Sequence, residues 1–299
     1  MRTNIARRTG LAVAVVAALT SVAACNSSDK DKDDRGSGVV KADPIAALKQ
    51  VQKKTGGADS AKVEGTTRIG TLVSMKQTGV VGWGDGLVGT MTIEYTGGTM
   101  ADAVTQNGGS GTMEARYYKD GYAVNMGDAF AQQSGGKHWI SYDYADMAKL
   151  AGASGEAVKQ QMQNATPSQG VESLLASGDV KKVGEEDVRG VPTTHYSGTV
   201  DVAKLTEKSS ALDAKQLAEL KKQLADTGIT TEQVDIWVDK NDLLVKKSES
   251  GQMKTGEFNS TVFYSDYGSK ISVEKPPAGD TLKFADLMKQ QQKAGAPTG

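Results

Sequence analysis

The feature that most constrains the fold is an alternation of apolar and polar residues with a period of two. The clearest run covers residues 87–95, where Met91, Ile93 and Tyr95 alternate with Thr92 and Glu94. Successive side chains of a strand point to opposite faces, so this pattern gives one apolar face and one polar face. Such a strand belongs to an antiparallel sheet that is covered on one side.

The same alternation recurs along the chain between turn-forming residues. Asp120-Gly121 within residues 116–124 indicates a hairpin, and 35 glycines punctuate the 299 residues. We expect further strands at 63–69, 180–183, 191–200, 234–238, 243–248, 261–265 and 271–274, with residues 184–190 and 241–242 as turns. A sheet of about ten or more strands should curl strongly.

Several helices are expected beside this sheet. Asp43 can cap a helix that starts at Pro44, and Gly56-Gly57 should end it. Further helices are predicted at 145–150, 156–163, 168–176 and 212–225, with a short terminal helix that carries Phe284, Leu287 and Met288. Residues 101–111 are polar and rich in glycine, which indicates a loop. Sequential antiparallel strands with a few helices on one face define an α+β domain.

The N-terminus has the three parts of a secretory signal: a basic start, a short apolar run and small residues before a cleavage site. Arginines stand at positions 2, 7 and 8, and residues 11–20 form the apolar run, which is too short for a comfortable membrane span. Val22-Ala23-Ala24-Cys25 resembles the bacterial lipobox. That resemblance implies diacylglyceryl transfer to the thiol of Cys25, the only cysteine in the chain, and cleavage before it.

The alternative is an ordinary secretory signal with Cys25 incidental. A lone thiol in an exported protein has no internal disulfide partner, and lipidation gives it a role. The arginine pair at positions 7 and 8 loosely resembles a twin-arginine signal, but we favour the general secretory route. We therefore divide the chain into a signal peptide (1–24), a disordered tether (25–42), a folded domain (43–288) and a polar tail (289–299).

Charge and composition exclude several classes of protein. Removing residues 1–24 deletes three arginines and leaves 32 basic against 36 acidic residues. This balance is not that of a nucleic-acid-binding protein. The two histidines, His138 and His195, are far apart in sequence, so we expect neither a metal site nor a cofactor. His195 is expected to be a solvated strand residue, and no spacing supports a catalytic triad. Asp235 and Asp239 would lie roughly 13 Å apart on one strand, too far for paired-carboxylate hydrolysis.

Four stretches, residues 180–196, 234–244, 263–268 and 273–277, resemble the LppX/LprG-type lipoproteins of actinobacteria. That family shares its fold with the LolA and LolB lipoprotein carriers and the RseB sensor. The resemblance implies an α+β fold with a strongly curved antiparallel half-barrel sheet and helices packed on its concave face. In some members a hydrophobic cavity between sheet and helices holds acyl chains.

We therefore expect a non-enzymatic lipoprotein, held at the outer face of the cytoplasmic membrane by acylated Cys25, that binds a lipid or a lipoprotein acyl group as a monomer. The alternative function is an envelope sensor or interaction lipoprotein without a carried ligand. The candidate cavity residues are Met91, Ile93, Tyr95, Tyr117, Val124, Val234, Ile236, Val238, Leu217, Leu220 and Leu224. Periodicity alone leaves plain core packing open for all of them.

Overall fold

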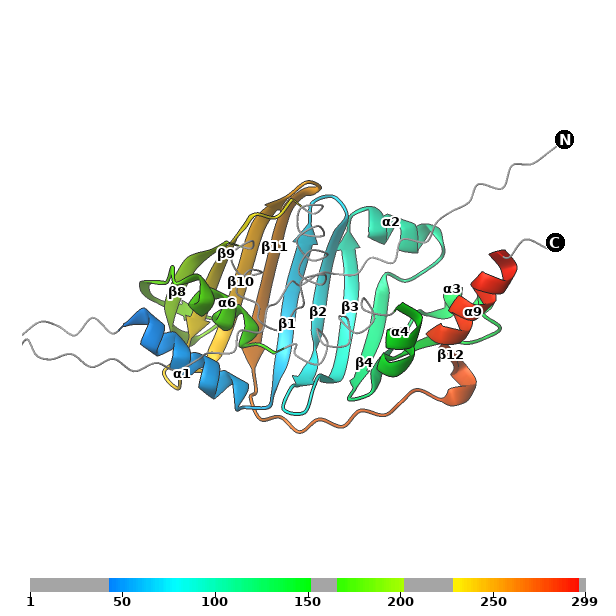
Figure 1. The fold of residues 1–299 in the computed structure, drawn as a ribbon, viewed down its shortest axis with the longest axis horizontal. Helices are drawn as coiled ribbons and strands as arrows, with labels where there is room; N and C mark the ends of the chain where they lie inside the picture. Colours follow the sequence, from blue (N-terminus) through cyan, green and yellow to red (C-terminus); the bar gives the residue numbers. More distant parts are fainter. Residues whose placement is uncertain (1–42, 152–165, 202–227, 296–299) are drawn as a thin grey trace, which may run out of the picture.

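A computed structural model describes residues 43–151, 166–201 and 228–295, and within them one sheet dominates the fold (Figure 1). Its strands are β1 (Ser60–Ile69), β2 (Val73–Gly82), β3 (Val88–Gly97), β4 (Thr112–Tyr118), β5 (Gly121–Asn125), β6 (Trp139–Asp143), β7 (Lys181–Val188), β8 (Val191–Asp201), β9 (Thr231–Val238), β10 (Leu244–Met253), β11 (Gly256–Ser265) and β12 (Thr281–Lys283). The helices are α1 (Pro44–Gly56), α2 (Thr99–Gln106), α3 (Asp128–Gln133), α4 (Tyr144–Ala151), α6 (Gln169–Ser177) and α9 (Phe284–Gly295), with a 3₁₀ turn η1 (Ala278–Asp280).

The twelve strands form a single sheet in the order β12-β6-β5-β4-β3-β2-β1-β11-β10-β9-β8-β7. All neighbouring strands are antiparallel except β12, which pairs parallel with β6 through Leu282 and Ile140. The predicted α+β class, the size of the sheet and its antiparallel pairing are confirmed, with this one parallel edge as the exception.

The sheet is curved and open, and local irregularities contribute to its shape. Register shifts interrupt the ladders between Ser74 and Met75, between Lys182 and Gly184, and between Leu244 and Lys246. A bulge bends its strand and increases the right-handed twist. The helices pack on the concave side, which we call the inner face and define by the side chains of Val63, Ile236 and Tyr264.

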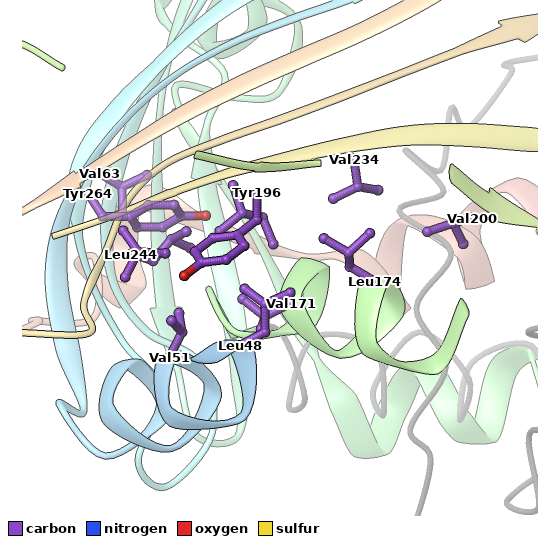
Figure 2. Packing of buried hydrophobic residues seen from close by; sticks show 12 residues of the cluster. Leu48, Val51, Val63, Val171, Leu174, Tyr196, Val200, Val234, Leu244 and Tyr264 are labelled. Atoms are coloured by element: carbon purple, nitrogen blue, oxygen red, sulfur yellow. The ribbon is translucent and has the colours of Figure 1, made fainter. Parts of the chain in front are cut away.

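The main core lies under α1 and α6, at the β7–β11 end of the inner face (Figure 2). The capping prediction for α1 is confirmed, because the Asp43 carboxylate accepts the Ile45 N–H at 3.0 Å and Pro44 opens the helix. The fully buried residues include Leu48 and Val51 from α1 and Leu174 from α6. These side chains pack against β8, β9, β10 and β11 through Tyr196, Val200, Val234, Ile236, Val238, Leu244 and Tyr264.

Two predicted loops are wrong. Residues 101–111 were expected to be irregular, but α2 occupies Thr99–Gln106, because the glycines begin only at Gly108 and the preceding alanines favour a helix. Residues 184–190 were expected to form a turn, but β7 continues to Val188 and the turn is Arg189-Gly190. β7 is an edge strand, and its exposed glutamates suit that position.

Two predicted boundaries near the C-terminus also differ. Residues 271–274 form no strand, because their expected partner, β11, is already paired with β1 and β10 on its two sides. The terminal helix continues past Met288 to Gly295, since lysine, glutamine and alanine favour helix there. The predicted helices at 145–150 and 168–176 are confirmed as α4 and α6, whereas those at 156–163 and 212–225 lie outside the described residues.

Candidate functional site

A cavity of about 360 Å³ lies at the other end of the sheet, where β4, β5, β6 and β12 meet α4 and α9 (Figure 1). Its apolar walls are formed by Tyr118, Tyr122, Ala123, Tyr142, Met147, Leu150, Pro276, Ala278, Phe284 and Ala285. The polar side chains around it are Asp120, Ser141, Asp143, Asp146, Lys275, Thr281 and Lys283. The lining is therefore amphipathic, because aromatic and charged side chains both contribute to it.

A row of aromatic rings crosses three strands beside this cavity. Strand register places Tyr117, Tyr122 and Tyr142 directly opposite one another on β4, β5 and β6, on the inner face. The rings of Tyr122 and Tyr142 stack with centroids 4.6 Å apart and an interplanar angle of 9°. Phe284 extends the row, with its centroid 4.9 Å from that of Tyr142. Aromatic packing of this kind adds stability beyond simple burial and holds the rings in place.

Burial raises the pKa of the tyrosines in and beside this row. It raises the pKa of Tyr144 and of Tyr118 to about 12. Burial also raises the pKa of Tyr117, Tyr122 and Tyr142. Like any tyrosine, whose ordinary pKa is about 10, all five carry neutral hydroxyl groups at physiological pH, which can donate or accept a hydrogen bond.

Residues 274–281 run along the end of the strands toward β12 (Figure 1), and Lys275, Pro276, Ala278 and Thr281 from this segment line the cavity. The Glu274 carbonyl accepts hydrogen bonds from Arg116 Nη1 at 3.0 Å and from the Tyr118 hydroxyl at 3.4 Å. Lys275 Nζ pairs with Asp120 Oδ2 at 2.6 Å. These exposed contacts are individually weak, but together they fix this segment against β4.

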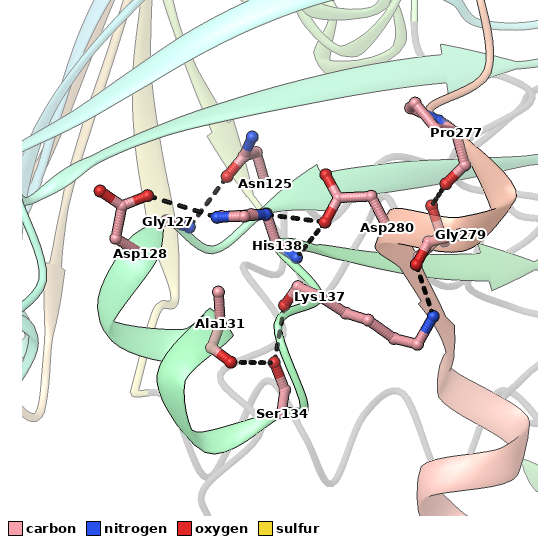
Figure 3. A network of polar contacts seen from close by, with 11 residues as sticks. Asn125, Gly127, Asp128, Ala131, Ser134, Lys137, His138, Pro277, Gly279 and Asp280 are labelled. Atoms are coloured by element: carbon pink, nitrogen blue, oxygen red, sulfur yellow. Dashed lines mark hydrogen bonds and ion pairs between the residues drawn. The ribbon is translucent and has the colours of Figure 1, made fainter.

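His138 fixes the other end of the same segment (Figure 3). Its Nδ1 lies 2.7 Å from Asp280 Oδ1, and its backbone N–H donates to the same oxygen at 2.8 Å. Its Nε2 lies 3.3 Å from Asp128 Oδ1, and Lys137 Nζ donates to the Gly279 carbonyl at 2.7 Å. This network holds η1 and β12 beside β6 and so positions the residues that line the cavity.

The network also shifts the ionisation of its members. The hydrogen bond to Asp280, together with the charges of Asp280 and Asp128, raises the pKa of His138. The backbone and side-chain hydrogen bonds from His138 lower the pKa of Asp280. Because 142 residues separate the two side chains, sequence spacing gives no sign of this pair.

The predicted cavity residues fall into two groups. Three of them belong to the packed core, and the others lie elsewhere on the inner face or outside the described residues. Val234, Ile236 and Val238 are at most 4 % exposed and belong to the packed core under α1 and α6. Plain core packing, the alternative left open by periodicity, describes their position. None of the three lines the cavity at the β12 end.

The remaining predicted residues lie on the inner face or outside the described chain. Met91 is buried, and Ile93, Tyr95 and Val124 are half-buried along β3 and β5. Tyr117 packs against Tyr122, which lines the cavity. Leu217, Leu220 and Leu224 fall in the part that the structure leaves undescribed, so their role stays a prediction.

None of the residues that line the cavity was among the predicted cavity residues, although the sequence contains one signal for them. Five of the nine tyrosines fall between residues 117 and 144. This local density marks the aromatic row, but the pairing of β5 with β6 and the packing of α9 beside them depend on distant segments.

The expectation that His195 is a solvated strand residue is wrong. Its side chain is only 14 % exposed. Its ring stacks on that of Trp237 with centroids 4.3 Å apart, and its Nε2 lies 2.8 Å from Asp235 Oδ1.

A group of charged residues is buried on the inner face close to the core. Lys247 Nζ pairs with Glu249 Oε1 at 2.7 Å, with side chains only 12 % and 14 % exposed. Glu232 lies on the same face of the neighbouring β9. Burial and the nearby charge of Glu249 raise the pKa of Glu232 to about 7.

The described residues contain neither a membrane-spanning helix nor a cluster of metal ligands. Within residues 43–151, 166–201 and 228–295, no helix is both long and apolar enough to cross a membrane. In the same ranges, no group of three or more histidine, cysteine, aspartate or glutamate side chains is arranged to hold a metal ion.

Comparisons with known proteins identify relatives over nearly the whole sequence. No family model matches the chain. It is 42 % identical to "Putative lipoprotein SCO4650" of Streptomyces coelicolor over 96 % of this chain and 98 % of that protein. It is also 68 % identical to a Streptomyces griseus protein, described as an uncharacterized 31.2 kDa protein of the rplA-rplJ intergenic region, over 84 % of this chain and 83 % of that protein.

Among solved structures, the chain is similar to two mycobacterial proteins, LprF and the lipoprotein LppX. LprF of Mycobacterium bovis matches at 14 % identity with a TM-score of 0.46, over 79 % of this chain and 97 % of LprF. LppX of Mycobacterium tuberculosis matches at 15 % identity with a TM-score of 0.45, over 77 % and 97 %. The family itself follows from the Streptomyces coelicolor relative, which matches over 98 % of its length: the chain belongs to the Streptomyces lipoprotein family that includes SCO4650.

Proposed function

We propose that the protein is an exported lipoprotein, anchored by acylated Cys25 at the outer face of the cytoplasmic membrane, that binds the acyl part of a lipid or lipoprotein. The observation that carries the proposal is the aromatic cavity at the β12 end of the sheet. Its volume of about 360 Å³ falls within the range of roughly 300–1,000 Å³ typical of ligand sites, and its walls are mostly apolar.

The energetics of such a cavity favour a short or partly buried acyl chain. Each buried methylene group contributes about 0.8 kcal/mol, so about eight of them would provide roughly 6 kcal/mol before ordering costs. The charged side chains around the cavity, among them Asp120, Lys275 and Lys283, would leave the polar part of an amphiphile close to water. The proposed role is binding or carriage, without catalysis.

The N-terminal sequence supports the anchor. Residues 26–42 are rich in serine, aspartate, lysine and glycine, and this composition favours a flexible connection between Cys25 and α1. A connection of this length would allow the folded domain to bind ligands near the membrane surface while staying attached to it.

Native mass spectrometry of the protein extracted from membranes in mild detergent tests both parts of the proposal. We expect a covalent mass increase of acyl groups on Cys25 and an additional non-covalent acyl ligand. Cys25→Ser should remove the covalent increase and release the protein from the membrane fraction. An acylated protein that is always empty would support the alternative, a sensor or interaction lipoprotein. An unmodified N-terminus at another residue would contradict the anchor.

A further inference from the structure

A second, smaller hollow lies on the convex side of the sheet, away from the helices. We call this side the outer face and define it by the side chains of Thr66, Lys76 and Thr261, which strand register places opposite one another on β1, β2 and β11. The hollow has a volume of about 170 Å³. Residues of β11, β1, β2 and β3 line it, and those that alternation places on the outer face are Thr66, Arg68, Ser74, Lys76, Thr96, Asn259 and Thr261.

The lining of this hollow carries positive charge. Arg68 and Lys76 belong to it, whereas no carboxylate among the described residues does. Register pairs Arg68 with Ser74 and Thr66 with Lys76, so the two cations are diagonal neighbours on β1 and β2. Diagonal neighbours on one face lie roughly 7–8 Å apart. Two long basic side chains at that separation can contact the same anion.

Neither cation is neutralised by a carboxylate in the described part of the chain. Arg68 Nε donates a long hydrogen bond to the Gly70 carbonyl at 3.4 Å, and Lys76 forms no ion pair there. Another basic residue on the same face of β1 differs in this respect, because Lys62 Nζ lies 3.5 Å from Glu64 Oε1. The charge at the hollow is therefore available to a ligand.

Two exposed carboxylates lie near the hollow without lining it. Glu94 is opposite Lys76 on β3, and Glu257 precedes Asn259 by two residues on β11. The hollow is therefore a small positive region within a face of mixed charge, and this arrangement favours recognition of one anionic group over attachment to an extended polyanion.

Uncharged donors complete the lining. Within residues 43–151, 166–201 and 228–295, the hydroxyl groups of Thr66, Ser74 and Thr96 form no hydrogen bonds, so they can donate to a ligand. Arginine and lysine make strong charge-assisted hydrogen bonds to phosphate oxygens, and the planar arginine fork can contact two oxygens at once. Cations and hydroxyl groups without a carboxylate thus fit a phosphate group.

We propose that this hollow on the outer face binds a phosphate group. Arg68 and Lys76 supply the positive charge, and the neighbouring hydroxyl groups donate hydrogen bonds to the phosphate oxygens. A volume of about 170 Å³ is below the roughly 300 Å³ of usual ligand pockets, so it fits a single charged group and not a whole lipid. The phosphate can belong to the headgroup of an anionic lipid or to a soluble phosphate ester. This site is separate from the cavity at the β12 end.

A membrane anchor would make even a weak site of this kind effective. Each basic residue near an anionic surface strengthens binding about 5-fold. The mature chain has 32 basic against 36 acidic residues, so its net charge does not draw it to anionic lipid. Anchoring through Cys25, as proposed above, would raise the effective concentration of headgroups at the site.

The first arm of the test uses lipid vesicles and the mature chain carrying Cys25→Ser, which has no acyl anchor. Binding is measured by co-sedimentation at low ionic strength. We expect binding to an equal mixture of phosphatidylglycerol and phosphatidylcholine, and none to phosphatidylcholine alone. Arg68→Gln and Lys76→Gln should each weaken it about 5-fold. Lys62→Gln removes the same charge from the same face outside the hollow, and this matched control should weaken binding clearly less.

The second arm uses inorganic phosphate, followed by the amide NMR signals of the same chain. We expect the shifts to concentrate at Thr66, Ser74 and Lys76 and to be strongly reduced in Arg68→Gln. Sodium chloride at equal ionic strength controls for general salt effects. Thermal unfolding monitored by circular dichroism checks that each variant is folded.

The two arms separate the sources of the phosphate. Vesicle binding that depends on Arg68 and Lys76 would assign the site to lipid headgroups, whereas phosphate-specific shifts without vesicle binding would assign it to soluble phosphate esters. The proposed site would be overturned if chloride caused the same shifts and vesicle binding were either absent or unchanged in both folded variants. Because neither arm measures the acyl ligand, that result would leave the proposed function intact.

Discussion

At the scale of single residues, His138 connects the two segments that enclose the cavity, and its ionisation should be measurable. The chain has only two histidines, so their imidazole signals are readily separated by NMR. We expect the pKa of His138 to lie above the ordinary value of about 6.5. Asp280→Asn should return it toward that value, while His195→Gln assigns the second signal. An unshifted His138 in the wild-type protein would contradict the network.

The same pKa gives the pH dependence of stability. A histidine whose pKa is raised on folding binds its proton more tightly in the folded state. Its stabilising contribution is complete below about pH 6.5 and is lost as the pH rises through the folded pKa. Asp280, with a lowered pKa, should lose its contribution only in acid. The destabilisation caused by His138→Gln should therefore be larger at about pH 5.5 than at about pH 9 in urea unfolding.

Glu232 should also make the protein less stable as the pH rises, because burial raises the pKa of this carboxyl group by disfavouring its charge. The charged form costs stability above about pH 7, whereas the protonated form costs little. We expect Glu232→Gln to raise the free energy of unfolding by the order of 1 kcal/mol at about pH 8 and to have little effect at about pH 4. Glu257→Gln, at an exposed position of β11, is the matched control. A loss of stability at pH 8 would refute this account of Glu232.

Contacts between residues close together in the sequence could be predicted, whereas contacts between distant residues could not. Asp43 and Pro44 specify the start of α1 through contacts within three residues, so the sequence was sufficient. The pairs His138–Asp280 and His195–Asp235 join different strands or segments. Their formation depends on strand order, which periodicity does not contain.

At the scale of elements, β9 shows how a strand can be predicted correctly while its role is not. The alternation of Val234, Ile236 and Val238 predicted one apolar face, and that face is present. Whether the face meets other side chains or a ligand depends on the helices that cover it. Here α1 and α6 fill the space with Leu48, Val51 and Leu174. The strand predicted at 271–274 does not form for a related reason. A segment can join a sheet only where a neighbouring strand has an unpaired edge, and alternation alone does not show that.

Substitution by tryptophan distinguishes a filled core from an open face. Ile236 is fully buried, so Ile236→Trp should overpack the core and cost about 1–3 kcal/mol in urea unfolding. Ile93, half-buried on the same face of β3, is the matched position, and Ile93→Trp should cost clearly less. Equal small losses at both positions would indicate that the face around Ile236 is not tightly packed.

At the scale of the whole molecule, one curved sheet carries two different arrangements on its helical side. The β7–β11 end is closed by α1 and α6 over a packed core, whereas the β12 end combines α4 and α9 with a cavity (Figure 1). Composition and alternation predicted the sheet, its approximate size and its covered face. The position of the cavity could not be predicted, because it forms where the C-terminal β12 and α9 return to β6, more than 130 residues along the chain.

The central claim, that the cavity at the β12 end holds an acyl ligand, is tested most directly by blocking it. Ala285 is buried on α9 and lines the cavity, so Ala285→Phe should fill part of that space. Val183→Phe, at an exposed position of the edge strand β7, adds the same ring elsewhere and is the control. The measurement is the acyl ligand bound per protein, by native mass spectrometry of membrane-extracted samples. We predict ligand in the wild-type and Val183→Phe proteins and a marked loss in folded Ala285→Phe; equal ligand in all three would contradict the account.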